Sequence, residues 1–283
     1  MKSGEVIFAP RLVILKRRND DRLLSESEEP VSDSSWKGRI DYSAVLRSLR
    51  TPLWSRLEEL SIRYEYDGNH NLRYLELARN VLRHGVKHVI LLGSGKGVLE
   101  SILPKDVTCF SVDINRGELV VAFEINWPRE NRHFVQADIF RLPFRDGFRT
   151  QMVVISEVLE HVERDDKVLE AAKRLLDPEG FLLLTVPNIE RLINRLIVVL
   201  GRREYFMSED HLREYRLSET LRMLWRQGFA PRYIVPVYLR LVKEVRLRRY
   251  IGLINPLRRL ILVLFPRFAT YYLILARKGS SVA

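Results

Sequence analysis

From residue 87 onward, short runs of apolar residues alternate with segments in which apolar residues recur at helical spacing. Runs that are apolar throughout, rather than at every second position, are typical of strands buried on both faces. Strands that alternate with helices favour a parallel sheet whose crossover helices cover both faces. The chain therefore predicts a doubly wound, Rossmann-like α/β fold with a seven-stranded, mostly parallel sheet. The seven predicted strands are residues 89–92, 107–112, 133–137, 151–155, 181–186, 233–237 and 271–276.

The length of 283 residues suits one large α/β domain with an extension. Residues 1–35 are expected to form an N-terminal extension or linker, because residues 19–35 are rich in Asp, Glu and Ser. The domain itself is predicted over residues 36–279. Within it, residues 238–266 form a basic, apolar insertion between the last two predicted strands.

The balance of 47 Lys and Arg against 36 Asp and Glu gives a net charge of +11. Such an excess favours acidic partners, which include nucleic acid, an anionic membrane surface and phosphorylated substrates. No run of about 18 apolar residues predicts a transmembrane helix. The single cysteine, Cys109, lies in an apolar run, so we expect a buried thiol and neither a disulfide nor a metal site. These features suit a cytoplasmic protein, with peripheral membrane contact left open.

A glycine-rich turn, Gly93-Ser94-Gly95-Lys96-Gly97, directly follows the first predicted strand. Glycines there allow a tight turn with positive φ and let a ligand approach the backbone closely. Free N–H groups at the start of the next helix can bind an anion such as a carboxylate. In a doubly wound sheet this position is the switch point at which ligands bind. Taken alone, the turn also fits a purely structural purpose.

Two acids follow the next two predicted strands. Asp113 ends the second strand, where an acidic side chain accepts hydrogen bonds from a ribose diol. Asp138 follows the third strand, where a carboxylate can accept a hydrogen bond from an exocyclic amine. A nicotinamide dehydrogenase shares the first acid but needs the pattern Gly-x-Gly-x-x-Gly, and here position 98 is valine. The alternating glycines and the second acid therefore disfavour a nicotinamide site.

Several segments in this order resemble the motifs of class I S-adenosylmethionine-dependent methyltransferases. The first three are similar to the glycine, ribose and adenine motifs of that family. The later ones resemble the subgroup that includes the ubiquinone and menaquinone biosynthesis methyltransferases, of type 11 and type 23-like sequence. The resemblance spans about residues 70–235 and the final strand. The matching segments are residues 88–97, 112–114, 137–139 with 142–144, 156–162, 180–188, 211–215 and 228–229.

The resemblance implies S-adenosyl-L-methionine as the cofactor and a set of residues that bind it. These are Gly93, Ser94, Gly95, Gly97, Asp113, Ile114, Asp138, Ile139 and Ser156. One position departs from the family. Leu91 stands where the family usually has an acid near the amine of the cofactor, so another group has to meet that amine or the affinity is reduced. Glu157 is a candidate for this contact.

His161 follows the fourth predicted strand at the expected mouth of the site. A histidine near the transferable methyl group can take the proton of an oxygen nucleophile, so His161 is the predicted catalytic base. The alternative is a structural histidine that holds the loop by hydrogen bonds. Glu160 and His211 are second-rank candidates for the same task.

The acceptor of the methyl group is the least constrained part of the prediction. Residues 192–200, Arg202-Arg203 and the insertion at 238–266 combine apolar and basic side chains, which suits a lid near the substrate. An ordinary packed helix with a solvated arginine face has the same composition. We expect a small-molecule or lipid-like acceptor. The alternatives are an RNA methyltransferase, for which nucleic acid is a less favoured partner, and a non-catalytic cofactor-binding protein; the oligomeric state is left open.

Overall fold

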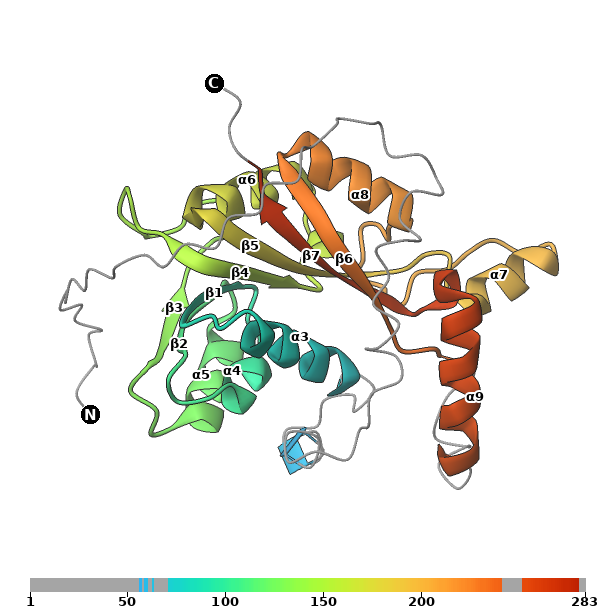
Figure 1. The fold of residues 1–283 in the computed structure, drawn as a ribbon, viewed down its shortest axis with the longest axis horizontal. Coiled ribbons are helices and arrows are strands. Elements are labelled where there is room, and N and C mark those ends of the chain that lie inside the picture. The colour runs from blue at the N-terminus through green and yellow to red at the C-terminus, as the bar shows by residue number, and fades with distance from the viewer. Residues whose placement is uncertain (1–55, 58, 61–62, 64–70, 241–250, 280–283) are drawn as a thin grey trace. The chain divides into compact units, whose positions relative to one another are not determined.

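A computed structural model describes residues 56–57, 59–60, 63, 71–240 and 251–279, all within one compact unit. Its sheet has seven strands in the order β3-β2-β1-β4-β5-β7-β6 (Figure 1). β1 to β5 are parallel to one another, and β7 is antiparallel to both β5 and β6. This arrangement confirms the predicted doubly wound, mostly parallel sheet. The strands are β1 His88–Leu92, β2 Thr108–Asp113, β3 Arg132–Gln136, β4 Thr150–Ser156, β5 Leu176–Pro187, β6 Phe229–Val237 and β7 Tyr271–Lys278.

Helices cover both faces of the sheet, as the apolar runs predict. α3, α4 and α5 lie on one face, and α6 and α8 lie on the other (Figure 1). α7 and α9 lie beyond the end of the sheet at which β5 stops and β7 begins. The helices are α3 Asn71–Arg83, α4 Val98–Ile102, α5 Arg116–Asn126, α6 Asp165–Leu175, α7 Leu192–Val199, α8 Leu217–Arg226 and α9 Ile251–Leu264.

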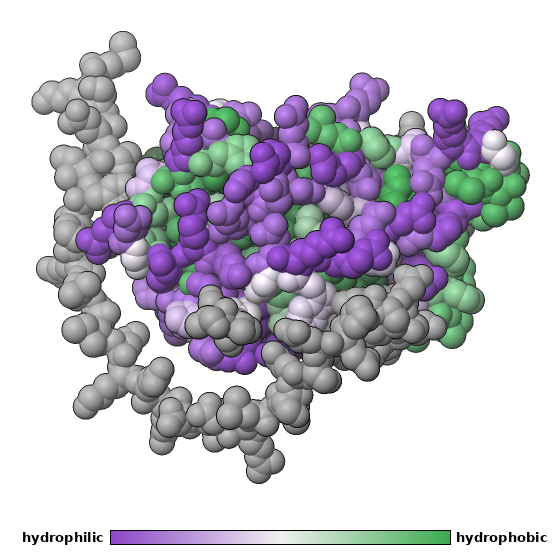
Figure 2. Space-filling model, turned by 90° about the horizontal axis from the view of Figure 1, so that it is seen from above, coloured by the Kyte–Doolittle hydropathy of each residue, from purple (hydrophilic) through white to green (hydrophobic). Residues whose placement is uncertain are grey.

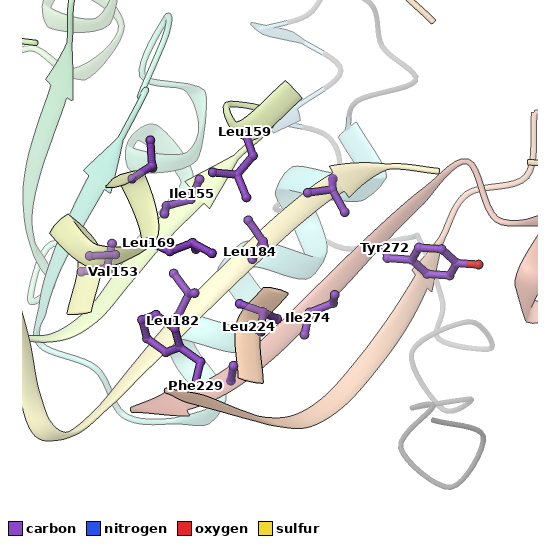
Figure 3. Close-up of a cluster of buried hydrophobic side chains, with 14 of the residues drawn as sticks. Val153, Ile155, Leu159, Leu169, Leu182, Leu184, Leu224, Phe229, Tyr272 and Ile274 are labelled. Atoms are coloured by element: carbon purple, nitrogen blue, oxygen red, sulfur yellow. The ribbon is translucent and has the colours of Figure 1, made fainter. Parts of the chain in front are cut away.

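Each face of the sheet has its own apolar core. Alternate residues of one strand point to opposite faces, so Ile90 of β1 belongs to one cluster and Val89 to the other. Figure 3 shows the first cluster, in which Leu184 of β5 lies between Leu169 of α6 and Leu224 of α8. The second cluster joins β1 and β4 to the apolar faces of α3 and α4. Burial on both faces is the physical reason that the strands are apolar throughout.

At the start of the described part, Leu57 and Leu60 are buried. The predicted extension, residues 1–35, lies outside the described residues. In the insertion, residues 241–250 are likewise outside the described part. Tyr238, at the start of the insertion, follows β6 with φ 61° and belongs to no helix. No helix in the described part is long and apolar enough to cross a membrane.

A buried carboxyl group joins α4 to β2 beneath the glycine turn. The side chain of Glu100 is fully buried, and the Ser111 hydroxyl donates a hydrogen bond to its Oε1. Oε2 has no hydrogen-bond partner among the described residues. Burial raises the pKa of Glu100 to about 7, against the opposing effect of the Ser111 hydrogen bond. The folded protein therefore holds a proton on Glu100 that the unfolded chain releases near pH 4.5.

This shift predicts a specific pH dependence of stability. A raised folded-state pKa stabilises the fold below the unfolded pKa, and that contribution is lost as the pH rises through about 7. Glu100→Gln keeps the shape of the neutral acid, so it should gain roughly 2–3 kcal/mol over the wild type between pH 4 and pH 8. Urea unfolding across this range measures the difference. Glu124→Gln, on the exposed face of α5, is the control, and equal pH profiles for Glu100→Gln and the wild type would contradict the shift.

Candidate active site

A cavity of about 480 Å³ opens where β1, β2 and β4 end. The chain continues from β1 to β2 on one side and returns to β4 on the other side, so the segments that follow these strands diverge. A crevice at this point is the general ligand site of doubly wound sheets. Most of the predicted site residues line the cavity, namely Gly93, Ser94, Gly95, Asp113, Ile114, Asp138, Ile139, Ser156 and His161.

The glycine turn forms one wall of the cavity. Gly93, Gly95 and Gly97 have φ values of 73°, 54° and 68°, a region that side chains disfavour. The N–H groups of Gly93 and Ser94 both donate to the carbonyl of Val112, which fixes the turn against the end of β2. The Ser94 hydroxyl is buried and has no hydrogen-bond partner among the described residues. It is therefore available to a polar ligand.

Asp113 ties the glycine turn to the end of β2. Its Oδ2 accepts a hydrogen bond of 2.8 Å from the Gly95 N–H, and its Oδ1 accepts one of 2.9 Å from the Asn115 N–H. Asn115 in turn caps α5, because its side chain accepts from the backbone of Gly117. Each carboxylate oxygen has a second lone pair, so Asp113 can still accept hydrogen bonds from a diol in the cavity.

Asp138 lies two residues beyond the end of β3, and its Oδ1 accepts a hydrogen bond of 2.9 Å from the Phe140 N–H. The side chains of Ile114 and Phe140 are 70% and 45% exposed although they are large and apolar, and both line the cavity. Exposed apolar side chains beside a carboxylate suit a flat heterocycle that carries an amine. The predicted roles of Asp138, Ile114 and Ile139 remain predictions.

Gly97 is placed differently from the other predicted cofactor residues, because it does not line the cavity. A Cβ atom there would lie 2.7 Å from the Cβ of Ala122 and 2.9 Å from the side-chain nitrogen of Asn126. The same Asn126 nitrogen donates a hydrogen bond of 3.0 Å to the Gly97 carbonyl. Gly97 therefore allows α5 to pack closely on the start of α4.

Behind the glycine turn, Leu91 is buried in the apolar core and also borders the cavity. Charge at this end comes from Glu157, which directly follows β4 with φ 55°, and from Arg73 of α3. Their side chains form an ion pair of 3.1 Å, and the Thr185 hydroxyl donates to the other oxygen of Glu157. Burial raises the pKa of Glu157, and the charge of Arg73 opposes that effect. Both residues line the cavity.

Arg73 is the site residue that sequence reasoning missed. Its Nε atom is buried and has no hydrogen-bond partner among the described residues. A signal was present, because Arg73 stands four residues before Leu77 and eight before Val81, on the apolar face of α3. An arginine on such a face requires a partner for its charge. That partner is Glu157, which directly follows β4 and stands far along the chain.

The other end of the cavity is formed by a short 3₁₀ helix, Leu159–His161, which follows β4. His161 borders the cavity, and its Nδ1 lies 3.3 Å from the Asp210 carbonyl oxygen. The rings of His161 and His211 meet edge to face with centroids 4.8 Å apart. Glu160 is fully buried beside them, and burial together with the charge of Glu157 raises its pKa to about 9. The three candidates for acceptor chemistry thus lie together.

The segment between α7 and α8 holds this end of the cavity in place. Glu214 is buried and forms an ion pair with Arg191. The Tyr215 hydroxyl donates to the Leu159 carbonyl at 3.1 Å and to Asp165 at 2.8 Å. The Leu212 N–H donates to the Glu160 carbonyl at 2.8 Å. These contacts fix His211 against the 3₁₀ helix.

Residues 90–184 match the model of a family described as "Methyltransferase domain". The matched segment starts within β1 and ends within β5, so it contains the glycine turn, both acids and the 3₁₀ helix. No curated protein matches the chain significantly.

Solved structures extend the comparison. The chain is similar to the N-methyltransferase NodS of Bradyrhizobium japonicum WM9 in complex with S-adenosyl-L-homocysteine. The TM-score is 0.51 and the identity 14%, and the match covers 84% of this chain and 97% of that chain. It is also similar to the magnesium protoporphyrin IX methyltransferase ChlM of Synechocystis PCC 6803 with bound S-adenosyl-L-homocysteine. The TM-score is 0.54 and the identity 14%, and the match covers 82% of this chain and 96% of that chain. At these identities the comparison shows that the chain shares the fold of these methyltransferases.

The family match and this fold support the predicted class I methyltransferase. A further similar structure is the 4+2 cyclase SpnF, at a TM-score of 0.50 and 15% identity, covering 73% of this chain and 82% of that chain. Because a cyclase shares the fold, the fold alone does not imply methyl transfer, and the residues of the site decide the chemistry.

The position of Gly97 generates a stability prediction with a matched control. Gly97→Ala places a methyl group against the backbone of α5, whereas Gly85→Ala, at a similar φ of 60°, meets nothing within 4 Å. Both changes should cost about 1 kcal/mol for the left-handed backbone. Gly97→Ala should cost roughly a further 1–3 kcal/mol for overpacking. Urea unfolding measures both, and equal losses in the two variants would show that Gly97 is needed for its φ alone.

Proposed function

We propose that this protein is an S-adenosylmethionine-dependent methyltransferase that acts on a small-molecule or lipid-like acceptor. The observation that carries the proposal is the joint placement of the glycine turn, Asp113 and Asp138 around one cavity at the switch point of a class I methyltransferase fold. We further propose that residues 36–279 form the catalytic domain. S-adenosylmethionine supplies the methyl group on a sulfonium, so the protein chiefly positions and desolvates the reactants.

The chain offers a group for each part of this cofactor. Asp113 accepts hydrogen bonds from the ribose diol, and the apolar side chains of Ile114 and Ile139 flank the adenine, whose amine faces Asp138. Ser94, Gly95 and Ser156 line the same cavity and are the proposed contacts to the rest of the cofactor. The buried and unpartnered Ser94 hydroxyl fits a polar ligand in this position.

Leu91 cannot bind the amine of the cofactor, so other residues have to bind its amino-acid part. That part carries an ammonium and a carboxylate, and the cavity presents a glutamate and an arginine side by side. In the proposed complex, Glu157 meets the ammonium and the unpartnered Nε of Arg73 meets the carboxylate. The acid that the family usually has in the first strand is thus replaced by one that follows the fourth.

A lipid-like acceptor is favoured by the surface at the same end of the sheet. α7 follows β5 and α9 precedes β7, and these strands meet where Pro187 pairs with Tyr271. Large apolar side chains are exposed on both helices, and Figure 2 shows hydrophobic surface at the end of the molecule where α7 lies. They are Leu196, Val198, Val199 and Leu200 at α7, and Leu257, Leu260, Leu264 and Phe265 at α9.

Exposed arginines, Arg202 and Arg203, follow this apolar area directly. Apolar side chains flanked by basic ones are the composition of a surface that lies on an anionic membrane. We therefore propose peripheral membrane contact of a cytoplasmic enzyme, with the acceptor drawn from or held near the lipid surface. The resemblance to quinone-biosynthesis methyltransferases, whose acceptors are lipid-like, agrees with this proposal.

Isothermal calorimetry with S-adenosylmethionine tests the cofactor site. The wild type should bind one molecule per chain. Asp113→Ala removes the proposed ribose contact and the tie to the Gly95 N–H, so it should weaken binding by roughly 10- to 100-fold, about 1.4–2.8 kcal/mol. Asp106→Ala, an exposed acid paired with Lys87 at the start of β2, should bind as the wild type does. A wild-type protein that binds no S-adenosylmethionine would refute the proposed function.

Vesicle flotation tests the membrane contact. The wild type should float with vesicles that contain phosphatidylglycerol and much less with pure phosphatidylcholine. Val199 and Leu200 are 83% and 76% exposed, so the double change to Glu should leave the fold intact and reduce the bound fraction at least tenfold. Val120→Glu, at a 51% exposed position on α5, is the control. If the double variant floats like the wild type, the apolar area does not contact lipid.

A further inference from the structure

Three side chains with metal-binding atoms meet at the acceptor end of the cavity. Glu160 and His161 belong to the 3₁₀ helix after β4, and His211 belongs to the segment between α7 and α8. One ligand atom of each residue lies within 4.8 Å of the others. The sequence did not predict a metal ion, because the histidine that completes the group stands far along the chain from the other two residues.

The state of Glu160 points to a ligand. Its side chain is fully buried, and neither carboxylate oxygen has a hydrogen-bond partner among the described residues. Buried carboxylates are normally paired or coordinate a metal. Within the described part of the chain, two other glutamates nearby have such partners, because the half-buried Glu157 pairs with Arg73 and the buried Glu214 pairs with Arg191. Glu160 alone of these three lacks a cation.

The two histidines are oriented as metal ligands are. The Nδ1 of His211 lies 3.0 Å from the Glu214 carboxylate, and the Nδ1 of His161 lies 3.3 Å from the Asp210 carbonyl. These oxygens accept, so each Nδ1 carries the proton and each Nε2 keeps a lone pair. Metal-binding histidines almost always donate their other ring N–H to a carboxylate or carbonyl in this way. Arg191 and the Met207 N–H hold Glu214 in turn.

We propose that Glu160, His161 and His211 bind one divalent transition-metal ion. Two imidazoles and one carboxylate favour Zn²⁺, Mn²⁺ or Co²⁺ over Mg²⁺ and Ca²⁺, which prefer oxygen ligands. Ligand atoms around one such ion lie roughly 3–3.5 Å apart, so binding draws the three side chains slightly together. His161 borders the cavity, so an acceptor bound there would lie beside the proposed ion.

The role of the ion in the reaction rests on the proposed function. A metal-bound hydroxyl of the acceptor has a lowered pKa and releases its proton to solvent. A lone pair of that oxygen then forms the new O–CH₃ bond, while the electron pair of the breaking S–CH₃ bond stays on sulfur. The oxidation state of the metal does not change. His161 is then a ligand, and the ion rather than the histidine activates a hydroxylated acceptor.

Calorimetric titration of the full chain with metal alone tests the site without any methyl transfer. After treatment with a chelator, the wild type should bind one Zn²⁺ or Mn²⁺ per chain, at least tenfold more tightly than Mg²⁺. Glu160→Gln removes the ligand charge with little change of shape and should weaken Zn²⁺ binding at least 100-fold. Glu163→Gln, an exposed acid one turn away, is the matched control and should bind as the wild type does.

A second variant and a spectrum distinguish loss of a metal ligand from misfolding of Glu160→Gln. His161 is exposed, so His161→Gln should fold as the wild type does and weaken Zn²⁺ binding at least tenfold. The visible absorption of Co²⁺ should change on binding to the wild type and not to Glu160→Gln. Equal Zn²⁺ affinity in the wild type and both variants would overturn the proposal. Calorimetry with S-adenosylmethionine on the same samples separates this outcome from a failure of the proposed function.

Discussion

β1 pairs in parallel with β2 on one side and with β4 on the other, and the position of the site follows from this pairing. The strands end at one edge of the sheet, and the segments that leave them turn in opposite directions. The gap between those segments is the cavity. Asp113 at the end of β2 then hydrogen-bonds across the gap to the Gly95 N–H, which fixes the turn after β1. Burial of both faces of the sheet holds these strand ends in register, so the core and the site depend on the same pairing.

The sheet and the donor side of the site could be predicted because their signals are local. Strands buried on two faces are apolar throughout, and a turn that needs positive φ uses glycine, as at Gly93 and Gly95. Residues that come into contact only in the folded protein are harder to identify as partners from the sequence. Arg73 is visible in the sequence as an arginine on an apolar helix face, but nothing local identifies Glu157 as its partner. The packing of Gly97 against Ala122 is equally a product of tertiary contact.

Buried charge is concentrated around the segment that follows β4. Arg73, Arg191, Glu160 and Glu214 are buried and Glu157 is half-buried, and the pairs Arg73–Glu157 and Arg191–Glu214 join α3 and the start of α7 to the rest of the site. A buried ion pair contributes little net stability, since desolvation offsets the attraction. Its geometry, however, is specific. These pairs therefore act mainly by positioning the 3₁₀ helix, and they leave Glu160 as the buried acid whose oxygens have no hydrogen-bond partner among the described residues.

The two halves of the site are built from different parts of the chain, and this difference bears on function. The donor half comes from the ends of β1, β2 and β3, whose positions the sheet fixes. The acceptor half adds the segment between α7 and α8, which joins the sheet beyond the end of β5, through the bridge between Asn188 and Tyr215. Such a segment can change without disturbing the cofactor side. A fold shared by methyltransferases and a cyclase is then expected, because the acceptor half decides the chemistry. In the proposed function that half contains His211 and the anchored Glu214, which lie outside the matched family segment.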